Sequence, residues 1–360
     1  MQPNIKSIIL KSLKAQDVTY QEKIQTLWSG YGEIARYKVT GGIQSSVVLK
    51  HVKLPEEKNH PRGWNTDISH QRKIKSYQVE SAWYQELAQK CDDSCRIPKC
   101  YAVEKSAPEN REMEFLILLE DLNAAGYPVR KRTVSIEEMK ACLKWLANFH
   151  AVFLTENQER HVNNKLESDN QFGSGNKHCP SNKLWSIGTY WHLDTRSDEL
   201  KALDDIALKS ASSEIDKKLN QCRFQTLVHG DAKLANFCFS KDGLSVAAVD
   251  FQYIGGGCGM KDVAYFIGSC LYEEDCEKYE KELLDIYFSE LEKSLSIHQQ
   301  FVDFNALEKE WRNMYSYAWT DFHRFIKGWS PGHWKIHGYS ERIAREVIAN
   351  LTSQKLSSEK

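Results

Sequence analysis

Apolar positions recur along this 360-residue chain with two different periods. In the N-terminal third, segments of strand character alternate with glycine-containing turns, which predicts strands at about 32–39 and 45–52. The segment 114–122, with an unbroken apolar run at 115–119, predicts another strand, fully buried and ending in acidic residues. Apolar residues at helical spacing predict a helix over 71–90, and we also expect 18–28 to be helical. The first third is therefore expected to form a small, β-rich unit.

The rest of the chain follows mainly a helical period. Ser135 and Glu138 form an S-x-x-E capping box, which predicts the start of a long helix with a core-facing apolar stripe. The segments 276–295 and 304–349 are also predicted to be mainly helical. By contrast, 156–182 is polar and predicts an irregular surface segment, and the tail 353–360 is expected to fray.

The most specific pattern in the chain is a pair of motifs separated by a short apolar stretch. His229, Asp231 and Asn236 form H-x-D-x-x-x-x-N, and Asp250 begins a D-F-x motif. Phosphoryl transfer needs one carboxylate near the attacking hydroxyl, and a second carboxylate with an amide on Mg²⁺. We therefore expect Asp231 to accept or orient the acceptor proton, and Asn236 and Asp250 to bind Mg²⁺. The motifs predict an ATP-dependent phosphotransferase.

The stretch between the two motifs has the pattern of a β-hairpin. A short strand begins at Asn236, a Lys-Asp-Gly turn follows at 241–243, and a return strand leads to Val249. In this register Asn236 lies roughly opposite Ala248, and Asp250 lies about 6–7 Å further along the strand. The hairpin is thus expected to return Asp250 to the neighbourhood of Asn236, where both could reach one cation.

Elements for holding a nucleotide are predicted in the N-terminal third. Gly30 and Gly32 lie in a turn that runs into a strand, as in a loop that covers the phosphates of ATP. Lys50, in a Val-Val-Leu-Lys run, best matches the lysine that binds the α- and β-phosphates. Lys53 is the alternative, although its odd spacing from Lys50 places it on the opposite face of the strand.

The predicted helix and the buried strand supply two further nucleotide contacts. Glu80 is the candidate ion-pair partner that orients the phosphate-binding lysine, with Glu86 as the alternative carboxylate. The strand that ends at 120–122 is expected to join two lobes, so that backbone groups around Glu120 and Leu122 bind the adenine edge. The loop that follows marks the expected boundary between the lobes.

The segment after Asp250 indicates the kind of acceptor. Only eleven residues separate Asp250 from Asp262, four of them glycines, and no A-P-E sequence follows. A platform for a peptide substrate is hard to build in that length, so a small-molecule acceptor is favoured. We expect Asp262 to cap the following helix and to brace the catalytic loop.

Composition narrows the class of protein. The chain is 41% hydrophobic and 27% charged, and its net charge of −1 gives no basic field for nucleic acid. No apolar run approaches the roughly 20 residues of a membrane span and no signal-peptide pattern is present, so a cytoplasmic location without membrane attachment is expected. The ten cysteines do not have the spacing of a zinc site and are expected to be small core residues.

Together these motifs resemble the aminoglycoside phosphotransferase and choline kinase-like superfamily, and most nearly its ecdysteroid kinase-like members. The resemblance implies a bilobal protein kinase-like fold, MgATP as donor, and transfer of the γ-phosphoryl group to a hydroxyl of a small molecule. Lys233 and the glycine-rich run after Tyr253 depart from the pattern expected of these relatives. Because Lys233 resembles the protein-kinase lysine that contacts the γ-phosphate, we expect it to neutralise charge on the transferred group. The motifs that carry the resemblance are Val47–Lys50, Tyr77-x-x-Glu80-x-x-x-Tyr84, Leu118–Leu122, His229-Gly-Asp231-x-x-x-x-Asn236 and Asp250-Phe-Gln252.

The sequence thus predicts an α+β, kinase-like fold with a nucleotide-binding lobe over 1–122 and a catalytic, acceptor-binding lobe over 123–360. The alternative is a pseudokinase that binds a nucleotide or acts as a scaffold without turnover. Amine alcohols, amino sugars and sterols all stay open as acceptors, as do GTP as donor and the oligomeric state. Most aromatic residues of the last helical segment should be core, while a subset could wall an acceptor pocket or hold a cationic headgroup; they are Trp311, Tyr315, Tyr317, Trp319, Phe322, Phe325, Trp329 and Trp334.

Overall fold

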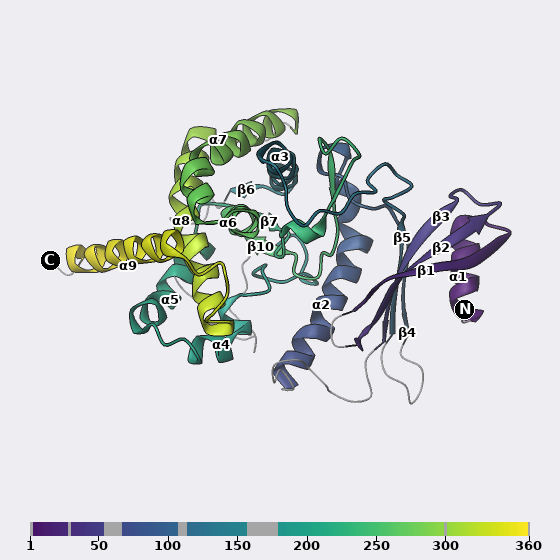
Figure 1. Cartoon of the computed structure of the whole chain (residues 1–360), viewed down its shortest axis with the longest axis horizontal. Coiled ribbons are helices and arrows are strands. Elements are labelled where there is room, and N and C mark those ends of the chain that lie inside the picture. Colours follow the sequence, from purple (N-terminus) through teal and green to yellow (C-terminus); the bar gives the residue numbers. More distant parts are fainter. Residues whose placement is uncertain are drawn as a thin grey trace. The chain divides into compact units, whose positions relative to one another are not determined.

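The computed structural model describes residues 3–27, 30–53, 67–106, 114–156, 179–298 and 301–358. The chain divides into two compact units. The first contains Met1–Arg130 and Cys238–Gln252, and the second contains Lys131–Phe237 and Tyr253–Lys360. Figure 1 shows a β-sheet as the main feature of the first unit and packed helices as the main feature of the second.

The first unit is built on a five-stranded antiparallel sheet with the order β1-β2-β3-β5-β4. Helix α1 (Pro3–Leu13) packs its apolar residues Ile5, Ile9 and Leu13 on one face of this sheet. Because successive side chains of a strand point to opposite faces, Val47 and Leu49 join α1 while Lys50 faces the other way. The strands are β1 (Asp17–Thr26), β2 (Gly32–Thr40), β3 (Ser46–Lys53), β4 (Cys100–Ser106) and β5 (Glu114–Glu120).

Helix α2 (Asp67–Glu86) belongs to the second core of this unit. Its Tyr77 packs with Val52 of β3 and Phe115 of β5, away from α1. Two short 3₁₀ turns, η3 (Ala88–Lys90) and η4 (Asp93–Cys95), connect α2 to β4. Lys50 of β3 and Glu80 of α2 are thereby buried together inside the unit.

The prediction of a helix over 18–28 is wrong for the residues that the structure describes there. They form strand β1 at the edge of the sheet, where Val18 alone among the strand's residues is buried. A strand exposed on both faces has no need of apolar alternation, and its Gln, Glu and Lys residues are good helix formers. Two register shifts opposite β2 interrupt the edge, at Tyr20/Glu22 and Lys23/Gln25.

The hairpin predicted between the two motifs is confirmed. Strands β8 (Phe237–Phe239) and β9 (Val246–Ala248) pair with each other. Asp242 closes the turn, since its carboxylate accepts hydrogen bonds from the Ser240 hydroxyl (2.6 Å) and the Leu244 amide (3.0 Å). The hairpin packs through Cys238 and Ala247 against Leu122, just beyond β5.

The second unit is mainly helical, as predicted. The Ser135–Glu138 capping box is present at the start of α3 (Ile136–Val152). Strand β7 (Phe224–Val228) lies between β6 (Thr155–Glu156) and β10 (Gly255–Gly257). The other helices are α4 (Ser197–Lys201), α5 (Ile206–Asn220), α6 (Met260–Cys270), α7 (Glu273–Ile297), α8 (Phe304–Trp329) and α9 (Gly338–Ser358), and two 3₁₀ turns are η6 (Leu193–Thr195) and η7 (Leu234–Asn236).

Aromatic side chains fill the core around α8. Trp311 and Phe325 are fully buried, and Trp191 packs with Tyr265 and Phe322. The prediction that the tail frays is wrong for 353–358, because these residues continue α9 to its end at Ser358. The polar segment predicted at 156–182 falls largely outside the described residues. Among the helices that the structure describes, none is long and apolar enough to cross a membrane.

Candidate active site

Lys50 is the centre of a buried ionic cluster in the first unit. Its Nζ atom lies 2.6 Å from Oε2 of Glu80 and 3.1 Å from Oδ1 of Asp250. Burial disfavours the charge on Lys50, but the two carboxylates outweigh it, so the pKa of Lys50 is raised. Burial raises the pKa of Glu80, with Lys50 opposing that shift. The cluster therefore holds a protonated ammonium at a fixed position, as the binding of nucleotide phosphates requires.

The rival residues from the sequence lie elsewhere. Lys53 points to the opposite side of β3, where its side chain is partly exposed and its Nζ atom lies 3.6 Å from Oε1 of Glu114. Glu86 is at the C-terminal end of α2, six residues beyond Glu80. The structure thus brings Lys50, and not Lys53, to the helix glutamate.

Asp250 has an unusual backbone conformation. Its φ of 70° lies in the left-handed region, which few residues other than glycine adopt and where strain often marks a functional site. Its side chain is 35% exposed, so carboxylate oxygen is accessible beside the Lys50 contact. The Gln252 amide donates to Oδ1 of Asp250 and accepts hydrogen bonds from Lys73 (2.7 Å) and Ser76 (3.2 Å) of α2. Gln252 thereby connects α2 to the predicted metal ligand.

The two positions of the predicted phosphate loop favour glycine for different structural reasons. Gly30 has a φ of 76°, and a Cβ atom there would meet no neighbour. Gly32 has a φ of 123°, and a Cβ atom there would lie 2.0 Å from the His51 carbonyl oxygen on β3. Gly32 is thus required by the close approach of β2 and β3, while Gly30 fits an open loop. Their contact with a nucleotide stays a prediction.

The predicted adenine-binding segment is already partly engaged by the protein. The Glu120 amide donates to the Lys99 carbonyl (2.8 Å), and the Glu120 carboxylate accepts from Arg96 (2.5 Å). The Leu122 carbonyl accepts from the Tyr127 amide at 2.8 Å. A base could therefore contact this segment only through its other backbone groups, and that contact stays a prediction.

In the second unit, Asp231 lies in the loop after β7, and three side chains contact its carboxylate. Lys233 Nζ lies 2.8 Å from Oδ2, and the Tyr265 hydroxyl of α6 lies 3.2 Å from Oδ1. The Asn236 amide nitrogen donates to the Asp231 carbonyl (2.7 Å) and to Oδ2 (3.2 Å). Because the nitrogen of Asn236 is used in this way, its oxygen is the end left for a cation. Asp231, Lys233 and Asn236 are thus brought together as one group.

Asp262 braces this loop but does not cap the helix. Its Oδ2 and Oδ1 atoms accept the backbone N–H groups of His229 (2.5 Å) and Gly230 (2.9 Å). Asp262 lies in the first turn of α6, and the N-cap residue is Gly259, so the predicted capping role is wrong. His150 of α3 supports the brace from behind, with its Nε2 atom 3.2 Å from Asp262 Oδ2. The carboxylate is better placed for two amides of a sharp turn than for the end of its own helix.

A cavity of about 450 Å³ opens beside Asp231 in the second unit. Two of its wall residues, Lys233 and Tyr265, are the ones that contact the Asp231 carboxylate. Cavities of this size accept small organic ligands. The complete wall is formed by Lys131, Arg132, Tyr190, Lys233, Leu234, Ala235, Tyr265, Ser269, Phe322, Ile326, Trp329, His333, Trp334 and Lys335.

The structure thus assembles the predicted site residues in two groups. Lys50, Glu80 and Asp250 meet in the first unit. Asp231, Lys233 and Asn236 meet in the second. A common cation for Asn236 and Asp250 stays a prediction. Sequence reasoning missed Tyr265 as a contact of the Asp231 carboxylate and Gln252 as a contact of the Asp250 carboxylate. The signal for Tyr265 in the sequence is its position three residues after Asp262, about one helical turn along α6. Gln252 gives no signal beyond its place as the third residue of the D-F-x motif.

The fold and these two groups define a kinase-like protein with a β-rich N-terminal part and a mainly helical C-terminal part. The chain belongs to the ecdysteroid kinase-like family, whose sequence model matches residues 34–300.

One solved structure supports this assignment at the level of the fold, and a second is also similar. An amicoumacin kinase in complex with AMP-PNP, Ca²⁺ and Ami is 14% identical, covers 97% of this chain and 96% of its own, and has a TM-score of 0.51. A microcompartment-associated aminopropanol kinase is 13% identical over 97% of this chain and 94% of its own, with a TM-score of 0.45. Among curated proteins, none matches the chain.

Proposed function

We propose that the protein is a small-molecule kinase that transfers the γ-phosphoryl group of ATP to a hydroxyl. The observation that carries the proposal is the Lys50 ammonium, which is buried between the carboxylates of Glu80 and Asp250. A buried lysine with a helix glutamate and a D-F-x aspartate is the arrangement that binds and orients nucleotide phosphates in kinases. In this proposal Lys50, positioned by Glu80, binds the α- and β-phosphates, and Gly30, Gly32, Glu120 and Leu122 surround the nucleotide.

The residues also fit a divalent cation. Asp250 offers accessible carboxylate oxygen and Asn236 an amide oxygen, which are the ligand types that Mg²⁺ takes together with phosphates and water. A bound Mg²⁺ would neutralise phosphate charge. Ca²⁺ in the complex of the amicoumacin kinase accords with a divalent metal in this fold.

Asp231 and Lys233 supply the chemistry on the acceptor side. The acceptor oxygen forms a bond to the γ-phosphorus, the bond from that phosphorus to the β–γ bridging oxygen breaks, and ADP leaves. The hydroxyl proton passes to Asp231, whose carboxylate is oriented by Tyr265 and Asn236. Lys233, 2.8 Å from Asp231, stabilises negative charge on the transferred group.

Calorimetric titration of ATP tests the nucleotide site directly. Wild-type protein should bind ATP more tightly with Mg²⁺ than without it, and Asp250→Ala should lose the Mg²⁺-dependent gain. Asp242→Ala is a matched control, because Asp242 lies in the turn of the same hairpin. If wild-type protein binds no ATP in the presence of Mg²⁺, the kinase proposal is wrong.

Turnover separates the kinase from a pseudokinase. ADP release should appear with pooled hydroxyl metabolites and stay at background with a generic protein substrate. Mg²⁺-dependent ATP binding without ADP release from any pool would favour the nucleotide-binding scaffold. Lys50 contacts Asp250 in the first unit, and Asn236 contacts Asp231 in the second. The presence of all four residues supports the enzyme, because a scaffold has no chemical need for them together.

A further inference from the structure

The cavity beside Asp231 is lined by several cations. Lys131, Arg132, Lys233 and Lys335 contribute to its wall, whereas no aspartate or glutamate is among the described residues that line it. Two of these cations have carboxylate partners outside the wall: Lys131 lies 2.7 Å from Glu138, and Lys233 lies 2.8 Å from Asp231. The described residues place no carboxylate within ion-pair distance of Lys335 or Arg132. The cavity therefore has excess positive charge.

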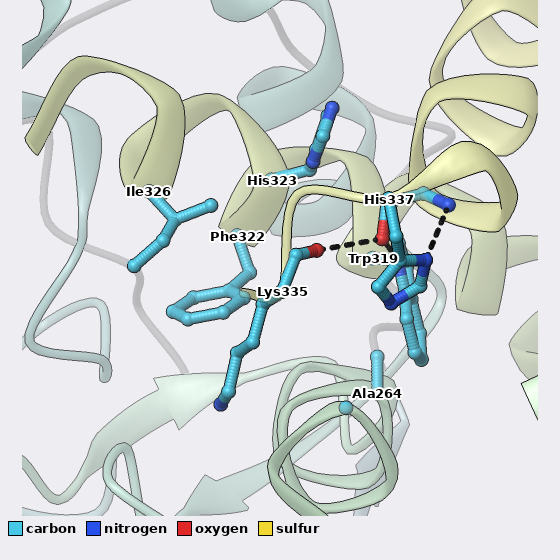
Figure 2. Close-up of a pocket in the computed structure, with 9 residues that line it drawn as sticks. Ala264, Trp319, Phe322, His323, Ile326, Lys335 and His337 are labelled. Carbon is cyan, nitrogen blue, oxygen red and sulfur yellow. Dashed lines mark hydrogen bonds between the residues drawn. The ribbon is translucent and has the colours of Figure 1, made fainter. Parts of the chain in front are cut away.

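Lys335 is held firmly in the wall by its backbone. It lies between α8 and α9, where its amide donates to Nδ1 of His333 (3.2 Å) and its carbonyl accepts from the Ser340 hydroxyl (3.0 Å). Figure 2 shows its side chain running alongside Phe322 and away from His323 and His337. These hydrogen bonds fix the backbone from which the Lys335 side chain extends toward the cavity.

The Lys335 ammonium lies against aromatic rings of the cavity. Its Nζ atom is 4.9 Å from the ring centroid of Tyr265, 5.1 Å from that of Phe322 and 5.6 Å from that of Trp334. Ring faces attract one cation, but a second cation at the same place would be repelled by the first. The expectation that these rings hold a cationic headgroup of a ligand is therefore disfavoured, because the protein supplies the cation itself.

The surroundings of Lys335 leave its charge poorly compensated. Burial lowers the pKa of Lys335 to about 8, far below the usual value for lysine. An anion placed next to the ammonium would restore the missing partner and favour the charged form. The apolar side chains of Phe322, Ile326 and Trp329 line the same cavity and offer contact to a hydrocarbon or aromatic body.

We propose that the acceptor is a hydroxyl compound with an apolar body and one anionic group, and that Lys335 binds the anionic group while the hydroxyl reaches Asp231. This proposal rests on the kinase function proposed above. A carboxylate, a sulfate and a phosphate share the chemistry that Lys335 recognises, and Arg132 at the rim adds attraction for any of them. The same charge distribution rejects aminoalcohols and amino sugars.

Binding of a matched pair of fluorescent probes tests the charge preference without any turnover. 8-Anilinonaphthalene-1-sulfonate and N-phenyl-1-naphthylamine share their aromatic body and differ in the sulfonate. Wild-type protein should bind the sulfonate at least tenfold more tightly, and Lys335→Met should remove most of that difference while leaving the neutral probe unchanged. Lys218→Met is the matched control, because Lys218 also lies over a ring, 5.9 Å from the Tyr317 centroid, but outside the cavity.

Three results would overturn the inference: equal binding of the two probes by wild-type protein, a Lys335→Met variant that keeps the sulfonate preference, or an equal loss in Lys218→Met. Lys335→Arg guards against misfolding, because it keeps the charge and should keep the preference. If Lys335→Arg folds and Lys335→Met does not, Lys335→Gln replaces Lys335→Met in the test.

A second arm uses turnover and separates this inference from the kinase proposal. Hydroxymethylbenzene derivatives that carry a carboxylate, sulfate, phosphate, carboxamide or aminomethyl group are offered with ATP, and ADP release is followed. Release with the anionic compounds above the neutral and cationic ones supports the inference, and the order among the three anions identifies the group. Release that is strongest with the amine would sink the inference and leave the kinase intact. Absent ATP binding would instead overturn the kinase proposal, with the probe pair still deciding the charge preference.

Discussion

The contacts of Asp231 predict the effect of removing its charge. Three donors, from Lys233, Asn236 and Tyr265, orient the carboxylate, and none of them belongs to the Lys50 cluster. Because a general base contributes about 10²–10⁴-fold to the rate, Asp231→Asn should reduce turnover by roughly that factor. ATP affinity should stay within about twofold, since the phosphates are assigned to Lys50.

Turnover and calorimetry on the same preparations check this prediction. Asp198→Asn serves as the control, because Asp198 is an exposed carboxylate in the first turn of α4. Lost ATP binding in Asp231→Asn would show that Asp231 is a metal ligand or a structural residue instead of the base.

The pKa of Lys335 predicts how anion binding depends on pH. With a pKa of about 8, Lys335 is charged below that pH and neutral above it. Affinity for an anionic probe should therefore be constant below about pH 7 and fall by roughly tenfold or more by about pH 10, while the neutral probe stays unaffected. Lys335→Arg should abolish the fall, because an arginine stays charged throughout. The titratable groups near the ammonium are Cys270 and Tyr265 of α6 and, in the loop after β7, Asp231 and Lys233. His333 lines the same cavity, whereas the Lys335 side chain points away from His323 and His337.

Fluorescence titrations of the two naphthalene probes between pH 6 and 10 measure this effect. Cys270 is not expected to interfere, because burial raises the pKa of its thiol to about 12. A fall of equal size in Lys335→Arg would assign the titration to another group, with Lys233 the next to examine.

Individual residues were predictable from the sequence where the chemistry demands one residue type at one spacing. Asp231, Asn236 and Asp250 were chosen as candidates in this way, and the structure places Asn236 beside Asp231 and Lys50 beside Asp250. The alternation along β3 separated Lys50 from Lys53. Lys335 was not found, because its significance depends on three rings from α6, α8 and the segment between α8 and α9. A contact among elements distant in sequence leaves no pattern of spacing.

At the scale of elements, Gln252 connects helix α2 to the predicted metal ligand. Its oxygen accepts from Lys73 and Ser76, and its nitrogen donates to Asp250. A hydrogen bond to a charged group contributes about 1.5–3 kcal/mol, so Gln252→Ala should weaken MgATP binding by about tenfold through a less ordered Asp250. Gln252→Glu should keep the contacts to α2 but place a second carboxylate beside Asp250. Comparison of the two variants therefore separates the effect of the α2 contacts from that of the hydrogen bond to Asp250.

Calorimetric titration of MgATP into the folded variants tests whether Gln252 supports MgATP binding. Gln225→Ala is the matched control, because Gln225 is a buried glutamine of β7 that donates to the carbonyls of Leu219 and Cys222. We expect that variant to lose stability without losing MgATP affinity. Unchanged MgATP affinity in Gln252→Ala would show that the bridge only packs α2.

Elements with a buried apolar face were predicted well, and β1 was not. Strand β5 and helix α3 carry long runs of core residues, and their positions follow from the apolar pattern. Strand β1 exposes almost every side chain, so hydrogen bonding to β2 alone decides its conformation. Backbone pairing at the edge of a sheet is not encoded in the period of apolar residues.

At the scale of the whole molecule, the family match runs through both compact units. It covers 34–300, which includes Lys50 and Glu80 of the first unit as well as Asp231 and Asn236 of the second. A kinase reaction needs both groups at one nucleotide, since the donor phosphates and the acceptor hydroxyl must meet. The proposed function therefore requires that a nucleotide bound by the first unit also affects the catalytic loop of the second.

Hydrogen exchange on the full chain tests this requirement. MgATP should slow amide exchange in 30–53 and also in 229–236, because Asn236 is assigned to the same cation as Asp250. Lys50→Met should abolish the protection in both segments, whereas Lys53→Met, a matched change on the same strand, should preserve it. Asn236→Ala should keep the protection of 30–53 and lose that of 229–236. If MgATP protects the first segment and never the second in wild-type protein, the two groups of residues do not share a nucleotide, and the assignment of Asn236 to the metal is wrong.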